Sequence, residues 1–318
     1  MPGMFALSVI VCTHNPRPDY LSRVLAALQQ QTLSRDKWEL LIIDNASAKP
    51  VAPAWPLAWH PHGRHLLEEA LGLTPARLRG IAEARGEILV FVDDDNVLRE
   101  DFLANVTLIA NDFPNLGAWG GNVTGEFEQP VPDWAQPHLH ALALREVKRD
   151  LWANYNIDNR SFPYGAGLCV RKPVTTAYAQ ALVARPDSKN LDRKGLSMTS
   201  AGDVDLVLTA YDAGFGTGVF RRLHITHLIP KGRLTVEYLC RLLEGIEYST
   251  HVLKNQRNPG YAPSLAPKRL KWLRAYRVWR LPEPTKSFAK AQDRGIAKAR
   301  AEITAKSSPA PNQVICPQ

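Results

Sequence analysis

Three consecutive carboxylates follow an apolar run in the segment ILVFVDDDN, residues 88–96. A buried Asp is costly to desolvate, and adjacent like charges repel one another. A divalent cation such as Mg²⁺ or Mn²⁺ relieves both problems, because it prefers carboxylate oxygens and leaves room for substrate phosphates. On extended backbone, residues i and i+2 point the same way. We therefore expect Asp93 and Asp95 to converge on a metal ion, with Asp94 on the opposite face; the alternative is an acidic turn that solvates itself.

The elements that must position these acids alternate between strands and helices. Three apolar, β-branched stretches that end in polar residues are predicted to be buried strands: 5–15, 38–47 and 87–96. Helical spacing, or a Pro near the start and a Gly at the end, predicts three helices: 20–33, 75–86 and 100–113. This alternation predicts an α/β domain with a parallel sheet at its core. Ligands bind beyond the carboxyl ends of such strands, so the polar strand ends should line one cleft.

A second acidic segment, SAGDVDLVLTAYDAGFG, spans residues 200–216 and has the pattern of a helix that begins with acids. Asp203 is its first acid, and its structural alternative is a first-turn residue that stabilises the helix by about 0.3–1 kcal/mol. Glycines at Gly121 and Gly165 would let the backbone approach a sugar or acceptor closely, or would simply form turns. Residues 224–246 are predicted as a short strand, a loop and a helix.

Taken together, these segments resemble family 2 glycosyltransferases with the GT-A fold. The resemblance covers residues 6–245, and its motifs occur in the family's order: SVIVCTHN, WELLIIDNAS, LTPARLRGIAEARGEILVFVDDDNVL, YGAGLCVRK, SAGDVDLVLTAYDAGFG and HLIPKGRLTVEYL. It implies a Rossmann-like mixed sheet flanked by helices. It also implies a nucleotide-sugar donor, UDP-linked by default, and Mg²⁺ or Mn²⁺ on the donor diphosphate.

The resemblance also implies roles for individual residues. The nucleotide-sugar would be bound by Thr13, Asn15, Asp44, Arg77, Asp93 and Asp94. The metal would be held by Asp95, Asp93 and His227, and positive charge or acceptor contacts would come from Lys231, Arg233, Gly121, Gly165 and Asp205. Asp203 falls where the family keeps its catalytic base. Two positions depart from the family pattern: Leu78 replaces the Asn of ARN, and Gly202 replaces the Glu of GED, which leaves Asp205 as the alternative base.

The implied reaction is an inverting transfer to a glycan or glycolipid hydroxyl, in cell-surface polysaccharide biosynthesis. Asp203 would take the proton of the acceptor hydroxyl, and the metal would neutralise the leaving diphosphate. One alternative is a nucleotidyltransferase, but CTHNPRPDY lacks the Gly-rich basic loop that such an enzyme would want after its first strand. Another is an inactive sugar-nucleotide-binding protein, against which the intact acids at 93, 95 and 203 argue.

The charge of the chain is concentrated near its end. The net charge is +8, but residues 254–306 hold 14 Lys and Arg against 3 Asp and Glu. We therefore predict a catalytic domain over 1–245 and a basic helical extension over 246–318 with a disordered tail. A helix over 267–281 would place Trp272, Tyr276 and Trp279 opposite its basic side, which suits an anionic membrane surface. The alternative is that this helix packs on the catalytic domain; no motif for nucleic acid accompanies the charge.

Location is predicted from cysteines and hydropathy. The four cysteines, at 12, 169, 240 and 316, have no metal-binding spacing and are expected to be reduced thiols. The N-terminus lacks the features of a signal peptide, and no uncharged run reaches the length of a membrane-spanning helix. These observations predict a cytoplasmic protein, peripheral on the inner face of the membrane through residues 254–306.

Overall fold

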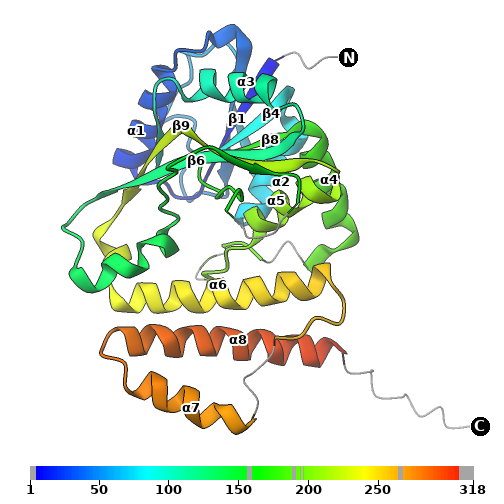
Figure 1. Cartoon of the computed structure of the whole chain (residues 1–318). Coiled ribbons are helices and arrows are strands. Elements are labelled where there is room, and N and C mark those ends of the chain that lie inside the picture. Colours follow the sequence, from blue (N-terminus) through cyan, green and yellow to red (C-terminus); the bar gives the residue numbers. More distant parts are fainter. Residues whose placement is uncertain are drawn as a thin grey trace, which may run out of the picture.

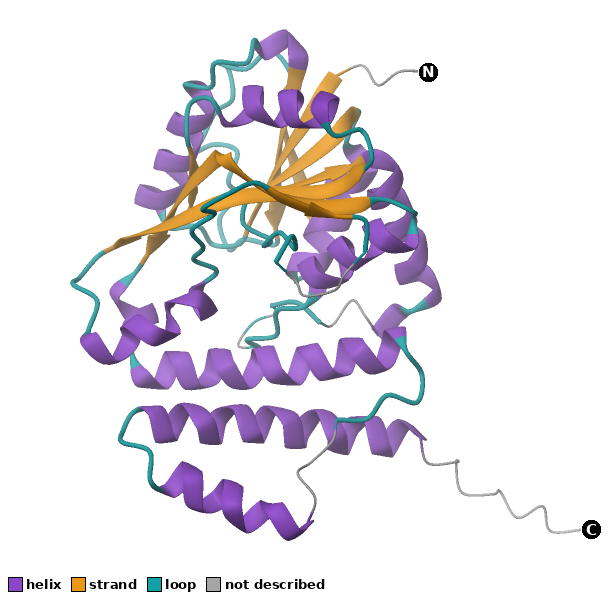
Figure 2. Cartoon of the chain, viewed as in Figure 1, coloured by secondary structure: helices purple, strands orange, loops and turns teal. Residues whose placement is uncertain are grey.

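The computed structural model describes residues 5–155, 160–187, 191–193, 195, 197–263 and 268–307. A mixed sheet forms its centre, in the order β3-β2-β1-β4-β8-β6-β9-β5, with β7 paired to β9. The strands are β1 (Phe5–Thr13), β2 (Trp38–Asn45), β3 (Gly63–Glu68), β4 (Gly86–Asp93), β5 (Asn96–Leu98), β6 (Leu116–Phe127), β7 (Leu151–Ala153), β8 (Leu168–Arg171) and β9 (Gly216–Ile229). Figure 2 shows these strands as one twisted layer with helices on both sides.

The predicted strands over 5–15, 38–47 and 87–96 correspond to β1, β2 and β4, which pair in parallel. Their register sets Thr13 beside Asp44 and Cys12 beside Asp93. The polar strand ends therefore meet at one edge of the sheet, as the sequence predicts. Beyond β4 the sheet becomes mixed, because β8 runs antiparallel to both β4 and β6.

Side chains of β1 alternate between two cores, because neighbouring residues of a strand point to opposite faces. Leu7 and Val9 pack with helices α1 (Pro18–Gln29) and α3 (Phe102–Asp112). Ile10 packs on the other face, in a core that includes helices α2 (Leu73–Glu83), α4 (Lys172–Ala184) and α5 (Gly202–Asp212). Figure 1 shows the two groups of helices on opposite sides of the sheet.

The C-terminal part forms a separate layer of helices, α6 (Val236–Arg257), α7 (Lys268–Trp279) and α8 (Thr285–Ser307). In Figure 1, α6 lies below the sheet, α8 runs beside α6, and α7 lies on the far side of α8. A third core joins α6 to Phe288 of α8 and to Leu142 of the 3₁₀ segment η2 (Asp133–Leu142). The predicted boundary between residues 245 and 246 lies inside α6. Residues 308–318, predicted as a disordered tail, lie outside the described residues.

Among the helices of the described ranges, none combines the length and the hydropathy that crossing a membrane requires.

Candidate active site

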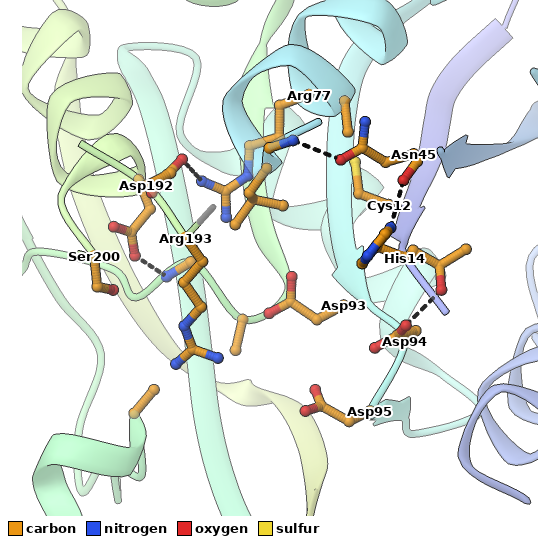
Figure 3. Close-up of a pocket in the computed structure, with 18 of the residues that line it drawn as sticks. Cys12, His14, Asn45, Arg77, Asp93, Asp94, Asp95, Asp192, Arg193 and Ser200 are labelled. Atoms are coloured by element: carbon orange, nitrogen blue, oxygen red, sulfur yellow. Dashed lines mark hydrogen bonds and ion pairs between the residues drawn. The ribbon is translucent and has the colours of Figure 1, made fainter. Parts of the chain in front are cut away.

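A cleft of about 380 Å³ opens at the carboxyl edge of β1, β2 and β4 (Figure 3). It lies within the usual size range of ligand pockets. The predicted site residues that line it are Thr13, Arg77, Asp93, Asp94, Asp95, Gly165, Asp203, His227 and Arg233. The sheet edge, α2, α5 and the segment after β9 thus contribute to a single cavity.

The three aspartates form a turn, which we call the acid turn (Asp93–Asp95). Asp93 ends β4, and the next two residues turn the chain into β5. Asp93 and Asp95 do lie close together, with Asp94 on the other side, but the predicted reason, an extended backbone over all three residues, is wrong. They are brought together instead by the Asn96 amide, whose Nδ2 donates to Asp93 Oδ2 and to Asp95 Oδ1, both at 3.1 Å. Asp94 turns away and accepts a hydrogen bond from the Thr13 hydroxyl.

Burial and crowding affect the three acids differently. Burial, with the neighbouring charge of Asp95, raises the pKa of Asp93. Burial also raises the pKa of Asp94 to about 7, against the hydrogen bond from Thr13. Burial acts on Asp95 too, but the positive charge of Arg233 beside its carboxylate outweighs it and lowers the pKa of Asp95. With all three carboxylates ionised, the acid turn would therefore carry more negative charge than its surroundings compensate.

His227 lies opposite Asn96 in the β5–β9 pairing, which places its ring beside the acid turn. Its Nε2 is 3.4 Å from Asp95 Oδ2, and its Nδ1 is 3.1 Å from the Leu142 carbonyl oxygen. Arg233 donates through Nη1 to His227 Nε2 and through Nη2 to Asp95 Oδ2, both at 2.9 Å. A guanidinium only donates, so Nε2 is the unprotonated nitrogen and Nδ1–H donates to Leu142. A metal-binding histidine needs the same arrangement.

The donor set suits a divalent metal in chemistry, since it offers carboxylate oxygens and a neutral imidazole nitrogen. In the described ranges, however, no three His, Cys, Asp or Glu side chains are arranged to hold an ion. The Arg233 guanidinium contacts both Asp95 and His227 and supplies positive charge there. Asp95, Asp93 and His227 thus fit a metal by their donor atoms, and Arg233 would have to move from Asp95 for one to bind.

Asp203 forms the opposite wall of the cleft, at the N-terminal end of α5. Its Oδ2 accepts a hydrogen bond from Gly165 N at 3.0 Å, and its Oδ1 accepts one from Val204 N at 2.9 Å. A Cβ on Gly165 would lie 2.6 Å from Asp203 Oδ2, so only glycine lets the backbone come this close. Burial raises the pKa of Asp203, against the Arg77 charge. A carboxylate whose pKa is raised towards the working pH suits a general base.

Residues 8–169 match the family described as glycosyl transferase family 2. The chain belongs to glycosyl transferase family 2. The predicted family and, at that level, the predicted enzyme class are therefore confirmed. The glycosyltransferase AglE of Haloferax volcanii is 27% identical over 208 residues, which are 62% of this chain. The aligned part makes up 65% of AglE, so the chain spans just under two thirds of that relative.

Solved structures of TarS from S. aureus, residues 1–349, share the fold of this family 2 chain. The complex with UDP-GlcNAc has a TM-score of 0.53 at 15% identity, covering 95% of this chain and 91% of that chain. The complex with UDP gives a TM-score of 0.50 over the same shares. The predicted GT-A architecture, a mixed α/β sheet flanked by helices with further C-terminal helices, is confirmed by this match and by the sheet described above.

Two residues that the family resemblance assigned to the nucleotide lie beside the cleft, Asp44 near the end of β2 and Asn15 in the loop after β1. Asp44 is buried, and its carboxylate accepts hydrogen bonds from Ser47 N at 3.1 Å and Val51 N at 3.0 Å. It therefore holds the loop after β2. Asn15 is exposed, has a positive φ of 50°, and accepts a hydrogen bond from Ala48 N at 2.8 Å. Neither side chain lines the cavity.

Three other predicted residues also lie outside the cavity. Gly121 packs inside the sheet, where a Cβ would lie 2.3 Å from the Leu223 carbonyl oxygen. Asp205 is buried and accepts a hydrogen bond from Arg257 Nε at 2.6 Å, so it connects α5 to the end of α6. Lys231 is exposed at the start of the 3₁₀ segment η4 (Lys231–Leu234).

The cleft is also lined by residues to which the sequence analysis assigned no role: His14, Asn45, Asp192, Arg193 and Ser200. His14 and Asn45 belong to the polar strand ends, so the predicted ends of β1 and β2 were a usable signal. His14 Nδ1 donates to the Asn45 carbonyl oxygen at 2.7 Å, and Asn45 Oδ1 accepts from Gly72 N at 2.8 Å. Figure 3 shows Arg193 extending into the cleft on the side of the acid turn.

Proposed function

We propose that this protein transfers a sugar, with inversion, from a UDP-sugar to a hydroxyl of a glycan or lipid-linked acceptor. The observation that carries the proposal is the placement of Asp203 and the acid turn in one cleft. The first is a buried carboxylate suited to remove a proton, and the second is an acidic strand end suited to a metal diphosphate. The fold shared with TarS, whose structures include UDP and UDP-GlcNAc complexes, supports the choice of donor.

In the proposed reaction the acceptor oxygen attacks the anomeric carbon while the bond from that carbon to the diphosphate oxygen breaks. The electron pair leaves with the diphosphate, and Asp203 takes the proton of the acceptor hydroxyl. Gly165 N–H fixes one oxygen of that carboxylate and so sets the direction of the other. Because this is a single displacement, the configuration at the anomeric carbon inverts.

Asp95, Asp93 and His227 would hold Mg²⁺ or Mn²⁺, which when bound supplies Lewis-acid stabilisation of the leaving diphosphate. Arg233 now contacts His227 Nε2 and Asp95 Oδ2, and once a metal displaces it from these two atoms its guanidinium would remain close enough to contribute a second positive charge. Thr13 holds Asp94 at the nucleotide side of the acid turn.

The decisive experiment is a panel of UDP-, GDP- and dTDP-sugars incubated with the full chain and Mn²⁺. Release of the nucleoside diphosphate is measured with and without glycan and lipid-linked acceptors. We expect one donor class to be hydrolysed slowly alone and turned over faster with acceptor. If none of these donors is hydrolysed, transferred or bound, the proposed function is wrong.

The same proposal places the protein at an anionic membrane surface, on the inner face of the cell membrane. On α7 the side chains of Trp272, Tyr276 and Trp279 are 65%, 50% and 69% exposed. The helix therefore does not bury these aromatic side chains against the catalytic domain, which was the alternative. Arg277 on the same helix is exposed, and Arg274 pairs with Asp293 of α8. Exposed indoles beside basic side chains suit the interface of an anionic bilayer.

Vesicle co-sedimentation tests this part. We expect the full chain to bind phosphatidylglycerol-containing vesicles at low salt and much less at high salt. The W272S/W279S variant should lose binding, whereas Trp152→Ser, which removes a 56% exposed indole from β7, should not. Equal binding by all three proteins would contradict the membrane role and leave the glycosyl transfer untouched.

A further inference from the structure

Asp192 connects two walls of the cleft that lie far apart in the sequence. Its side chain is only 4% exposed, and it accepts three hydrogen bonds. Oδ2 accepts from Thr74 Oγ1 at 2.9 Å and from Arg77 Nη1 at 3.1 Å, both on α2. Oδ1 accepts from Gly202 N at 3.0 Å, at the first residue of α5. The carboxylate therefore joins α2 to α5, the helix that carries Asp203. Figure 3 shows its bond to Arg77.

The same carboxylate occupies the space in front of Gly202. A Cβ built on Gly202 would lie 2.1 Å from Asp192 Oδ2, 2.4 Å from its Cγ and 2.7 Å from its Oδ1. Cβ atoms essentially never approach other heavy atoms so closely. A side chain at position 202 and the present position of the Asp192 carboxylate therefore exclude each other. Position 202 is also where the sequence departs from the Gly-Glu-Asp pattern.

Charge gives this contact a second function. The Arg77 side chain is 5% exposed, and Asp192 is its buried ion-pair partner. Removing one member of such a pair leaves the other charge buried and uncompensated. Arg77 lines the cleft with Cys12 and Asp93, so a displaced guanidinium would disturb the donor side directly.

We propose that Asp192 is a positioning residue that replaces, in space, the carboxylate missing at position 202. It holds Arg77 against the donor side of the cleft and fixes the first turn of α5, from which Asp203 projects. This role rests on the proposed function, both for Asp203 as the base and for a donor that binds beside Arg77. The replacement of an acid at position 202 by one at position 192, which we call the exchange, does not rest on the proposed function.

The exchange is tested by thermal unfolding of four full-length proteins: wild type, Asp192→Gly, Gly202→Glu and D192G/G202E. Each single change should lower the melting temperature by roughly 5–10 °C, the first through the lost pair and the second through the clash. The double variant should melt above both single variants, since the introduced glutamate side chain then has the vacated space. A double variant that melts at or below the less stable single variant overturns the exchange. Donor chemistry plays no part in this readout.

The positioning role is tested with the isosteric Asp192→Asn, which keeps the volume of the side chain. Dissociation constants are measured for UDP, GDP and dTDP, together with kcat on the best donor. We expect the Kd of the tightest nucleotide to rise about tenfold and kcat to fall about a hundredfold, with the melting curve still cooperative. A general loss of folded protein would lower apparent kcat and leave Kd unchanged.

The matched control is Asp187→Asn, which removes an exposed carboxylate paired with Lys306 and should change neither constant. Values of Kd and kcat for Asp192→Asn within twofold of wild type overturn the positioning role. If the wild type binds none of the nucleotides, the proposed function fails instead, and the melting cycle still decides the exchange.

Discussion

Two groups of aspartates lie in or near the cleft on opposite sides, and they are compensated in different ways. The acid turn places Asp93, Asp94 and Asp95 next to one another, and burial with mutual repulsion raises the pKa of two of them. The other group is spread along the chain, and each member has its own partner: Asp192 has Arg77, Asp203 has Gly165 N–H, and Asp205 has Arg257. Each acid of the second group thus has a donor within the protein, whereas a cation at the acid turn belongs to the proposed function.

This difference follows from how each group is built. Neighbouring residues at one strand end cannot move apart, so only charge from elsewhere relieves them, and Arg233 relieves Asp95 alone by a direct ion pair. Acids on a loop and a helix can each meet a separate donor. We call Asp192, Asp203 and Asp205 the rigid group, because each accepts a hydrogen bond from a donor of its own.

The largest effect should come from Asp203, the member of the rigid group that is proposed to act as the base. Asp203→Asn keeps the shape of the side chain and removes the base, so kcat should fall about 1,000-fold. The Kd of the nucleotide should stay within about twofold, because the acid turn is untouched. Asp112→Asn, at an exposed ion pair with Arg222, is the control and should behave as wild type. An unchanged turnover rate would exclude Asp203 as the base.

The next largest effect should be on stability, at the pair formed by Asp205 and Arg257. Asp205 is 1% exposed, and the guanidinium also donates to the Asp205 carbonyl oxygen at 2.8 Å. Arg257→Met should lower the free energy of unfolding by about 3–5 kcal/mol, because the buried carboxylate then keeps only its longer contact of 3.5 Å with Arg185 Nη2. Urea denaturation measures this. Arg294→Met, at the exposed pair with Glu244, should cost about 1 kcal/mol or less.

A double variant sharpens the interpretation of that pair. Asp205→Asn combined with Arg257→Met removes both charges, so the loss of stability should be smaller than the sum of the two single losses. Additive losses would show that the pair is not coupled, and that the rigid group is less connected than its contacts indicate.

A smaller effect, on donor binding, is expected from a substitution that alters the acid turn and leaves the rigid group unchanged. Asn96→Leu removes the amide that donates to Asp93 and Asp95 and should weaken Mn²⁺-dependent donor binding about 10–100-fold. In EDTA, wild type and variant should bind the donor equally weakly. Isothermal titration measures both. A donor that binds wild type equally well with Mn²⁺ and with EDTA would contradict the metal site.

The smallest effect is a shift in the pH at which kcat reaches half of its maximum. Burial raises the pKa of Asp203, and Asp192 and Asp93 act in the same direction, while Arg77 lowers it. A base must be deprotonated, so kcat should fall as the pH drops, with a midpoint above the value of about 3.9 for a free Asp. Arg77→Met removes the lowering charge and should move this midpoint to higher pH. A downward movement in the kcat–pH profile would contradict the assigned neighbours.

Much of the fold was predictable because its signals are local. The runs that became β1, β2 and β4 are apolar and end in polar residues, and their parallel pairing brings those ends together. Helical geometry also predicts that Asp203 and Asp205 point in different directions. Residues i and i+2 on a helix point about 200° apart, so only one of them can face the cleft.

Other parts of the site depend on contacts that no local pattern records. Asp192 meets Arg77 across 115 positions, from a loop without a motif. The carboxylate of Asp44 resembles a ligand-binding residue in sequence, yet backbone amides of the following loop take up both of its oxygens. The turn geometry of the acid turn depends on Asn96 and on pairing with β9, which begins 120 residues after β5 does.

The exclusion between Asp192 and a side chain at position 202 has an evolutionary consequence. Two residues that compete for one volume cannot vary independently, so substitutions at the two positions should appear together among homologous chains. An ancestor with glutamate at position 202 could gain an acid at position 192 only after, or together with, a change to glycine. Homologues should therefore divide into two groups, each with one acid at this place, and few sequences should carry both or neither.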